Sequence, residues 1–163
     1  MTFYHLNVFF HLLASVYWLG GMFFFAAVGA PVLRTLPDAR ERSALFRDLG
    51  RRFRSTAWIA ILVLLGTGIG NLHFRGLLRW EIWSASGFWI TAYGQLLAVK
   101  LALVAGMISV QLVHDFWLGP KASAVAPHTP QGFRFRKAAA WLGRGNALLG
   151  LVLLYVAVRL VRG

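Results

Sequence analysis

The sequence contains no cysteine and few acidic residues. Without cysteine, the chain cannot form disulfides, thiolate nucleophiles or iron–sulfur clusters. Any metal would have to be bound by His, Met, Lys, Asn or carboxylate side chains. Only five Asp and Glu stand against 17 Lys and Arg, which gives a formal net charge of +12. The basic residues cluster at the ends of long apolar runs, so we predict membrane lipid as their partner and no nucleic acid.

The chain is also poor in charge overall. Charged residues make up 13% of it and hydrophobic residues 58%, with a mean hydropathy of +0.63. A soluble domain carries about 25% charged residues, so this composition is typical of an integral membrane protein. The length leaves room for four spans and short loops, and for no second domain.

We predict an all-α fold: an integral membrane four-helix bundle in which residues 1–163 form a single domain. The spans are expected at about 3–32, 55–74, 91–118 and 138–161, on the basis of apolar runs long enough to cross a bilayer. Residues 34–54 hold seven arginines and have helical spacing of apolar residues, which predicts a short amphipathic helix at the cytoplasmic interface. Gly119-Pro120 is expected to stop the third span.

The basic residues also predict an orientation. The first and third loops carry most of the Lys and Arg, so the positive-inside rule places them in the cytoplasm and both termini outside. We expect this orientation in a bacterial-type inner (plasma) membrane.

The first span carries a polar stripe on an otherwise apolar helix. His11, Ser15, Trp18 and Met22 share one face of the predicted helix. The adjacent Gly20-Gly21 pair would let another helix or a flat ligand approach the backbone. An ionisable residue at this depth usually faces a partner or a cavity, so His11 is a candidate functional residue.

The third span carries a second stripe, whose central residue is Lys100. Its other members are Tyr93, Met107, Gln111 and His114. If both helices begin near the outer surface, Lys100 lies about 13 Å deep and His11 about 12 Å deep. We therefore predict that the two address one buried ligand, with His11 as neutral imidazole, and we take them as candidate catalytic residues. In the alternative interpretation, Lys100 snorkels to the interface and His11 hydrogen-bonds to a neighbouring helix.

The other histidines are further candidate metal or cofactor ligands. His73 and His5 are predicted at one level, near the outer ends of their spans, as an outer metal site or as interfacial hydrogen-bonding groups. His114 is followed by Asp115, which predicts either an interfacial His–Asp pair or a ligand at the depth of Met22.

Several polar residues could support such a site. Thr67 and Asn71 share a face of the second span and are expected to be hydrogen-bonding groups behind a ligand. Arg144, next to the start of the fourth span's apolar run, could pair with a carboxylate, a lipid phosphate or a haem propionate. His128 lies in a proline-bearing loop and is expected to face solvent.

Among cofactors, these residues favour haem b, with copper as the alternative. Helix bundles hold cofactors between facing helices, and His is the common axial ligand of haem. The aromatic residues and glycines of the first span, Trp18 among them, suit a flat porphyrin. The three methionines are a thin set for a copper pathway, which needs Met, His or Cys clusters.

Several motifs resemble a known family of membrane proteins. The segment from His11 through Trp18 to Gly20-Gly21 resembles the H-x6-W-x-G-G opening of the copper-resistance D-like (CopD-like) family, and HemJ-type protoporphyrinogen oxidases share its His and Trp. The LLGTG segment at Thr67 is similar to the second span of CopD-like domains. Lys100 resembles the lysine that opens the third span in both groups, and HDFWLG, from His114, is similar to the end of that span in HemJ-type proteins.

This resemblance implies a bundle of four or five spans. In HemJ-type proteins the corresponding His and Lys, here His11 and Lys100, are needed for activity, and the protein binds b-type haem.

Three functions therefore stay open. The first is a haem-b-binding redox protein, an electron carrier or a protoporphyrinogen oxidase-like oxidoreductase, with a quinone or another redox protein as partner. The second is copper transport or tolerance through His5, His11, His73 and the stripe methionines. The third is a structural accessory subunit, in which Lys100→Met would fold and function normally. Association into a homo-oligomer is compatible with all three.

Overall fold

Helices joined by short turns make up the chain over the residues that its computed structural model describes, 2–125 and 129–162, where no strand occurs. Four helical rods are long and apolar enough to cross a membrane: Phe3–Arg34, Ala39–Phe74, Ala92–Ala124 and Pro130–Arg162. The predicted all-α membrane fold with four spans is confirmed. His128 lies outside the described residues.

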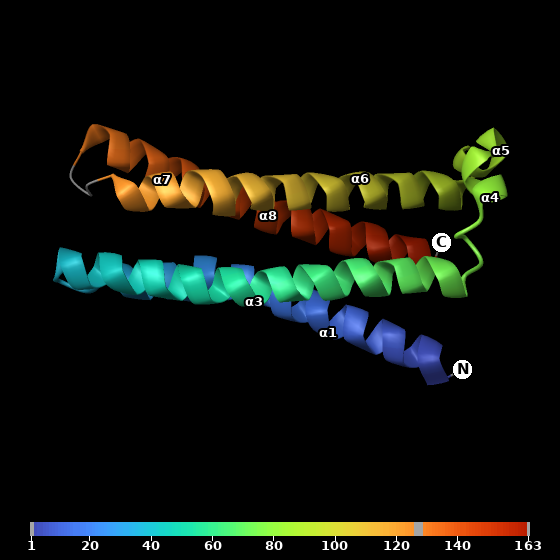
Figure 1. The fold of residues 1–163 in the computed structure, drawn as a ribbon, viewed down its shortest axis with the longest axis horizontal. Coiled ribbons are helices and arrows are strands. Elements are labelled where there is room, and N and C mark those ends of the chain that lie inside the picture. The colour runs from blue at the N-terminus through green and yellow to red at the C-terminus, as the bar shows by residue number, and fades with distance from the viewer. Residues whose placement is uncertain (1, 126–128, 163) are drawn as a thin grey trace. The chain divides into compact units, whose positions relative to one another are not determined.

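The helices pair into two units, Met1–Ala85 and Ser86–Gly163. Unit 1 is an antiparallel hairpin (Figure 1), made of α1 (Thr2–Phe24), η1 (Phe25–Gly29), α2 (Ala30–Arg34) and α3 (Ala39–Phe74), followed by the short α4 (Trp80–Ser84). Unit 2 is a second antiparallel hairpin, made of α5 (Ser86–Trp89), α6 (Ala92–Leu112), η2 (Val113–Leu118), α7 (Gly119–Ala124) and α8 (Pro130–Arg162). The assembly of both hairpins into one bundle stays a prediction.

The expected amphipathic loop helix is not a separate element, because its residues are the first half of α3. This helix has 36 residues, or about 54 Å, which exceeds the roughly 30 Å hydrocarbon core of a bilayer. No break occurs where the second span was expected to begin. The hydroxyl of Ser55 donates to the carbonyl of Arg51 (3.1 Å), one turn back, instead of capping a new helix. The basic half of α3 therefore extends the span beyond its apolar part.

Both prolines within the rods follow a π turn. η1 (Phe25–Gly29) precedes Pro31, and η2 (Val113–Leu118) precedes Pro120. Proline lacks an amide hydrogen and its ring crowds the preceding turn, so a widened turn lets the rod continue. The predicted stop at Gly119-Pro120 is therefore wrong, and the third rod runs on to Ala124.

Local capping explains where α3, α6 and α8 begin. The Asp38 carboxylate accepts the amide hydrogen of Arg40 (2.8 Å), and the Thr91 hydroxyl accepts that of Gly94 (3.0 Å). Thr129 caps α8 in the same way (3.1 Å to Gly132 N), directly before Pro130. Because of this cap, α8 begins eight residues before the predicted 138 and includes the basic run ahead of its apolar part.

Small residues bring α1 and α3 close together in unit 1. Ala57 and Ile61 of α3 are almost completely buried (0% and 1% exposed), and Trp18 of α1 is 5% exposed. A Cβ added to Gly21 would overlap the ring of Phe53, so the space beside this glycine is filled by α3. At Gly20 an added Cβ would meet nothing within 4 Å. Of the two expected open glycines, only Gly20 is open.

Candidate functional site

A ladder of hydrogen bonds joins α1 to α3 around His11. The half-buried imidazole of His11 lies with its Nδ1 2.7 Å from the Thr67 hydroxyl. One turn earlier, the Asn7 amide donates to the Thr67 carbonyl (2.9 Å) and to the Asn71 side-chain oxygen (3.0 Å). We call these four residues, Asn7, His11, Thr67 and Asn71, the histidine ladder. Thr67 and Asn71 were expected to share a face of the second span, and both bond to α1 residues of the ladder, Thr67 to His11 and Asn71 to Asn7.

The ladder favours one tautomer of His11. The Thr67 hydroxyl has one hydrogen, and it points to the carbonyl of Val63 in the preceding turn (2.6 Å). With that hydrogen donated within α3, the same oxygen accepts from His11, which favours the tautomer protonated at Nδ1. In the neutral ring, Nε2 then carries the lone pair. This arrangement, with Nδ1–H donated to a neighbour, is the one found in metal-ligating histidines.

Two contacts adjoin the ladder, and only the one that crosses to α3 sets the register of the two helices. The hydroxyl of Ser15 donates to the His11 carbonyl (2.7 Å) within α1. Across the interface, a Cβ on Gly70 would overlap the Asn7 amide, so glycine is required for Asn7 to reach α3. Asn7 was missed in the sequence analysis, although its position one turn before His11 places it on the same stripe.

Trp18 lies on the His11 stripe and is buried. Its indole Nε1 has no hydrogen-bond partner among the described residues. A buried unpaired donor costs about 1–3 kcal/mol, so an acceptor is expected to meet it. This is an additional observation in favour of a ligand beside α1.

His5 and His73 lie at the same end of unit 1, as predicted, but aromatic rings lie between them. Tyr4 contacts His5 (ring centroids 5.9 Å apart) and Phe74 (5.6 Å), and Phe74 contacts His73 (5.7 Å). Both histidines are exposed. Among the described residues, no three His, Cys, Asp or Glu side chains are grouped closely enough to hold a metal. Their role as an outer metal site stays a prediction.

A second polar network joins α6 and η2 to α8 in unit 2. His114 Nδ1 lies 2.8 Å from Asp115 Oδ1, Gln111 Nε2 donates to Asp115 Oδ2 (2.7 Å), and Asn146 Nδ2 donates to Gln111 Oε1 (3.0 Å). We call these four residues the amide relay. Asp115 and Asn146 are 5% and 1% exposed, and His114 and Asp115 lie in the η2 π turn, a feature frequent at functional sites.

The amide relay supports the His–Asp pair that the sequence analysis left open. His114 Nε2 lies 4.0 Å from the position of a Cβ on Gly143, which places this nitrogen against α8. A role for His114 as an additional haem or metal ligand, together with Met22 of α1, stays a prediction.

The remaining candidates lie on the spans as follows. Lys100 is half-buried on α6, on the same helix as the fully buried Met107. Met22 is half-buried on α1. Arg144 is exposed on α8, with its guanidinium 5.5 Å from the centre of the Trp141 ring. Lys100 belongs to unit 2 and His11 to unit 1, so their convergence on one ligand stays a prediction.

These features define a class: a multi-pass α-helical membrane protein with polar networks between paired spans. The model of the copper resistance protein D (CopD) family matches residues 47–160, and the chain belongs to that family. The matched region contains Thr67, Lys100, the amide relay and Arg144, and it begins after α1 and His11.

Comparison with individual proteins agrees with full-length relatedness. An uncharacterized protein of Aquifex aeolicus (strain VF5) is 30% identical over 160 residues, which are 97% of this chain and 95% of that protein. No solved structure matches the chain.

Proposed function

We propose that this protein handles copper in the membrane, as a transport or tolerance protein in which His11 ligates the ion in passage. The observation that carries the proposal is the half-buried His11 imidazole, whose Nδ1 lies 2.7 Å from the Thr67 hydroxyl, the kind of orienting bond that metal-ligating histidines make. Membership of the copper resistance protein D family supports copper as the ion. We place the protein in a bacterial inner membrane with both termini outside, from the distribution of its Lys and Arg.

Further copper ligands would come from the same helix. His5 is exposed at one end of α1, and Met22 is half-buried beyond His11. At 1.5 Å per residue, His11 lies about 9 Å from the level of His5 and about 16 Å from that of Met22. Imidazole and thioether are the ligands that suit Cu(I), so these side chains would mark separate positions along its path. His73, at the His5 end, would share the entry position.

Copper affinity of the purified protein tests this proposal. Cu(I) binding in detergent, measured by competition with a chromogenic chelator, is expected to weaken at least about 100-fold in His11→Leu. Ser15→Ala is the matched control, because it removes a polar group from the same stripe and keeps the imidazole. Equal copper affinity in the wild-type protein and His11→Leu would refute a His11 copper site.

A haem-b redox protein is the second candidate, and the buried Trp18 Nε1 favours it as a donor that a haem propionate could meet. His11 fits the group as an axial ligand through Nε2. The face at Gly21 does not fit it, because Phe53 fills that space. Lys100 and Arg144 would pair with propionates or a porphyrin-like substrate, and a quinone or another redox protein would exchange electrons.

An absorption spectrum separates the two candidates. If haem is the cofactor, protein expressed with haem supplied will show a Soret band that is lost in His11→Leu and retained in Ser15→Ala. Without that band in the wild-type protein, the haem candidate fails while the copper proposal is untouched.

A further inference from the structure

The amide relay has a fixed direction. Gln111 turns its NH2 group toward Asp115, because its Nε2 donates to Asp115 Oδ2. The Gln111 oxygen therefore faces Asn146, and the NH2 group of Asn146 donates a hydrogen bond to it. This order leaves Asn146 Oδ1 at the end of the relay. Among the described residues nothing donates to this oxygen, although Asn146 is only 1% exposed.

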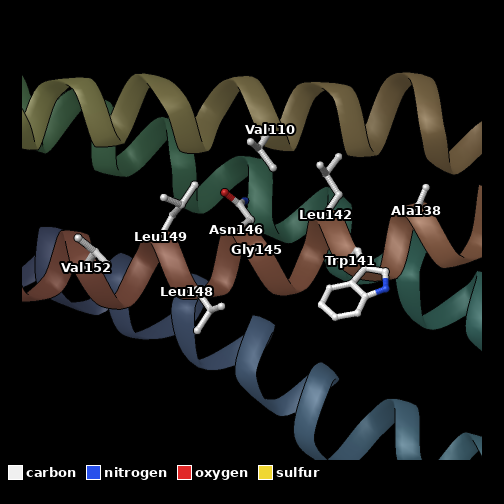
Figure 2. Close-up of a pocket in the computed structure, with 9 residues that line it drawn as sticks. All are labelled: Val110, Ala138, Trp141, Leu142, Gly145, Asn146, Leu148, Leu149 and Val152. Atoms are coloured by element: carbon white, nitrogen blue, oxygen red, sulfur yellow. The ribbon is translucent and has the colours of Figure 1, made fainter.

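This acceptor lies beside an apolar groove on the membrane-spanning part of unit 2. The groove measures about 530 Å³ and is lined by Val110 of α6 and, on α8, by Ala138, Trp141, Leu142, Gly145, Asn146, Leu148, Leu149 and Val152. Figure 2 shows the Asn146 amide pointing from α8 toward α6, between Leu142 and Leu149. The Asn146 amide is the one polar side-chain group in the groove besides the indole N–H of Trp141.

We propose that this groove binds a hydroquinone, whose phenolic hydroxyl donates a hydrogen bond to Asn146 Oδ1. The ligand must be a donor, because the relay leaves an acceptor. It must dissolve in the bilayer, because the groove walls are apolar and lie on spanning helices. A ring with a short substituent fits the volume. The oxygen is buried, so the hydroxyl reaches it after a rotamer change in the side chains that cover it.

Phospholipid is a poor occupant for the same groove. Its hydroxyl and amine donors are attached to a phosphate, which would lose water on entering. No lining residue carries a charge that could pair with that phosphate. An aliphatic alcohol has the donor but is a weaker acid than a phenol, so its hydrogen bond to Oδ1 is weaker.

Binding of matched ligands to the protein in nanodiscs tests the donor. Tetramethylhydroquinone, kept reduced with ascorbate, is compared with its dimethyl ether and with dodecanol by equilibrium dialysis against protein-bearing and empty nanodiscs. The hydroquinone is expected to bind about 10-fold more tightly than the ether, since one buried hydrogen bond separates them. Equal binding of the ether, or binding of dodecanol as tight as that of the hydroquinone, would overturn the proposal.

Two glycines provide matched variants. A Cβ on Gly145 in the groove, or on Gly106 of α6 outside its lining, would meet nothing within 4 Å. Gly145→Leu is expected to weaken hydroquinone binding at least about 10-fold by occupying the groove, and Gly106→Leu to leave it unchanged. If Gly145→Leu binds the hydroquinone as tightly as the wild type does, the groove is not the binding site and the proposal is wrong. If Gly145→Leu lowers the thermal midpoint and Gly106→Leu does not, the groove is filled by the protein itself, and the proposal is wrong as well.

Asn146→Leu separates the hydrogen bond from the shape of the groove. This variant should bind the hydroquinone and its ether equally, because the acceptor is gone. Should Asn146→Leu fail to fold, the ligand pair and the glycine pair still decide the proposal. A folded Asn146→Leu that keeps the 10-fold preference would show that another group accepts the hydroxyl, and would overturn the assignment.

Discussion

Each of the two units contains polar groups inside a membrane-spanning hairpin, and the two units pair these groups with different chemistry. The histidine ladder of unit 1 is built from imidazole, hydroxyl and amide groups, with the Thr67 hydroxyl bonded both to His11 Nδ1 and to the carbonyl of Val63. The amide relay of unit 2 contains a carboxylate, and its proton positions follow from Asp115. The ladder presents the imidazole of His11, and the relay ends on Asn146 Oδ1, to which nothing among the described residues donates.

That difference assigns different partners to the two ends. An imidazole nitrogen is a ligand for transition metals, whereas an amide oxygen in an apolar groove suits a hydroxyl donor. The comparison also indicates where stability is concentrated. Hydrogen bonds to a buried charge are stronger than those between neutral groups, so unit 2 should depend more on its network than unit 1 does.

Asp115→Leu should have the largest effect on stability. It removes the acceptor of both His114 and Gln111, and we expect a loss of about 3 kcal/mol in the free energy of unfolding, measured by SDS titration in mixed micelles. Asp48→Asn is the control, because Asp48 pairs with Arg51 on an exposed face, and should cost about 0.5 kcal/mol or less. Similar losses in both variants would mean that the relay adds nothing beyond a surface ion pair.

Thr67→Val should lower copper affinity about 10- to 100-fold without removing the ligand, because the Nδ1 proton loses its acceptor and the ring loses its orientation. Chelator competition measures the effect. Thr56→Val on the same helix is the control; its hydroxyl accepts from Tyr17 instead (2.6 Å). Equal affinities in the two variants would remove the connection between the ladder and the metal.

Gly21→Ala and Gly20→Ala should differ although the glycines are neighbours. The first places a methyl group against the Phe53 ring and should destabilise unit 1 by about 1–2 kcal/mol. The second meets open space and should be neutral or stabilise by up to about 1 kcal/mol, from helix propensity. Hydrogen exchange of α1 and α3 reports both changes. If both variants behave alike, the close packing of α1 on α3 is incorrect.

The spans and the polar stripes could be predicted from the sequence because each is a property of a single helix. Apolar runs locate the spans, and a spacing of three or four residues placed Thr67 and Asn71 on one face. The pairing of Gln111 with Asn146 could not be predicted, because it depends on how far two helices slide and rotate against each other. Periodicity along one helix does not contain that information.

The ends of the rods were also mispredicted, for a different reason. Gly119-Pro120 contains both residues that usually end a helix, yet η2 accommodates the proline. A backbone amide can donate to the carbonyl of the fourth preceding residue, as in an α-helix, or of the fifth, as in a π turn. Packing around the turn decides between the two, and the types of side chain in the sequence do not reveal this packing. Likewise, the second span was predicted to begin at residue 55 because the charged residues end there, whereas the backbone of α3 is helical from Ala39 onward.

The π turns have a consequence for how this chain could have changed its length. A π turn holds one more residue than the α turn it replaces, so it is the form in which a helix absorbs a single inserted codon. Each inserted residue would otherwise rotate everything beyond it by about 100°. In η1 and η2 the extra residue is confined to one turn. The number of residues in each rod can thus change by one at this turn, while the helix faces on either side keep their orientation and the loops between the spans keep their lengths.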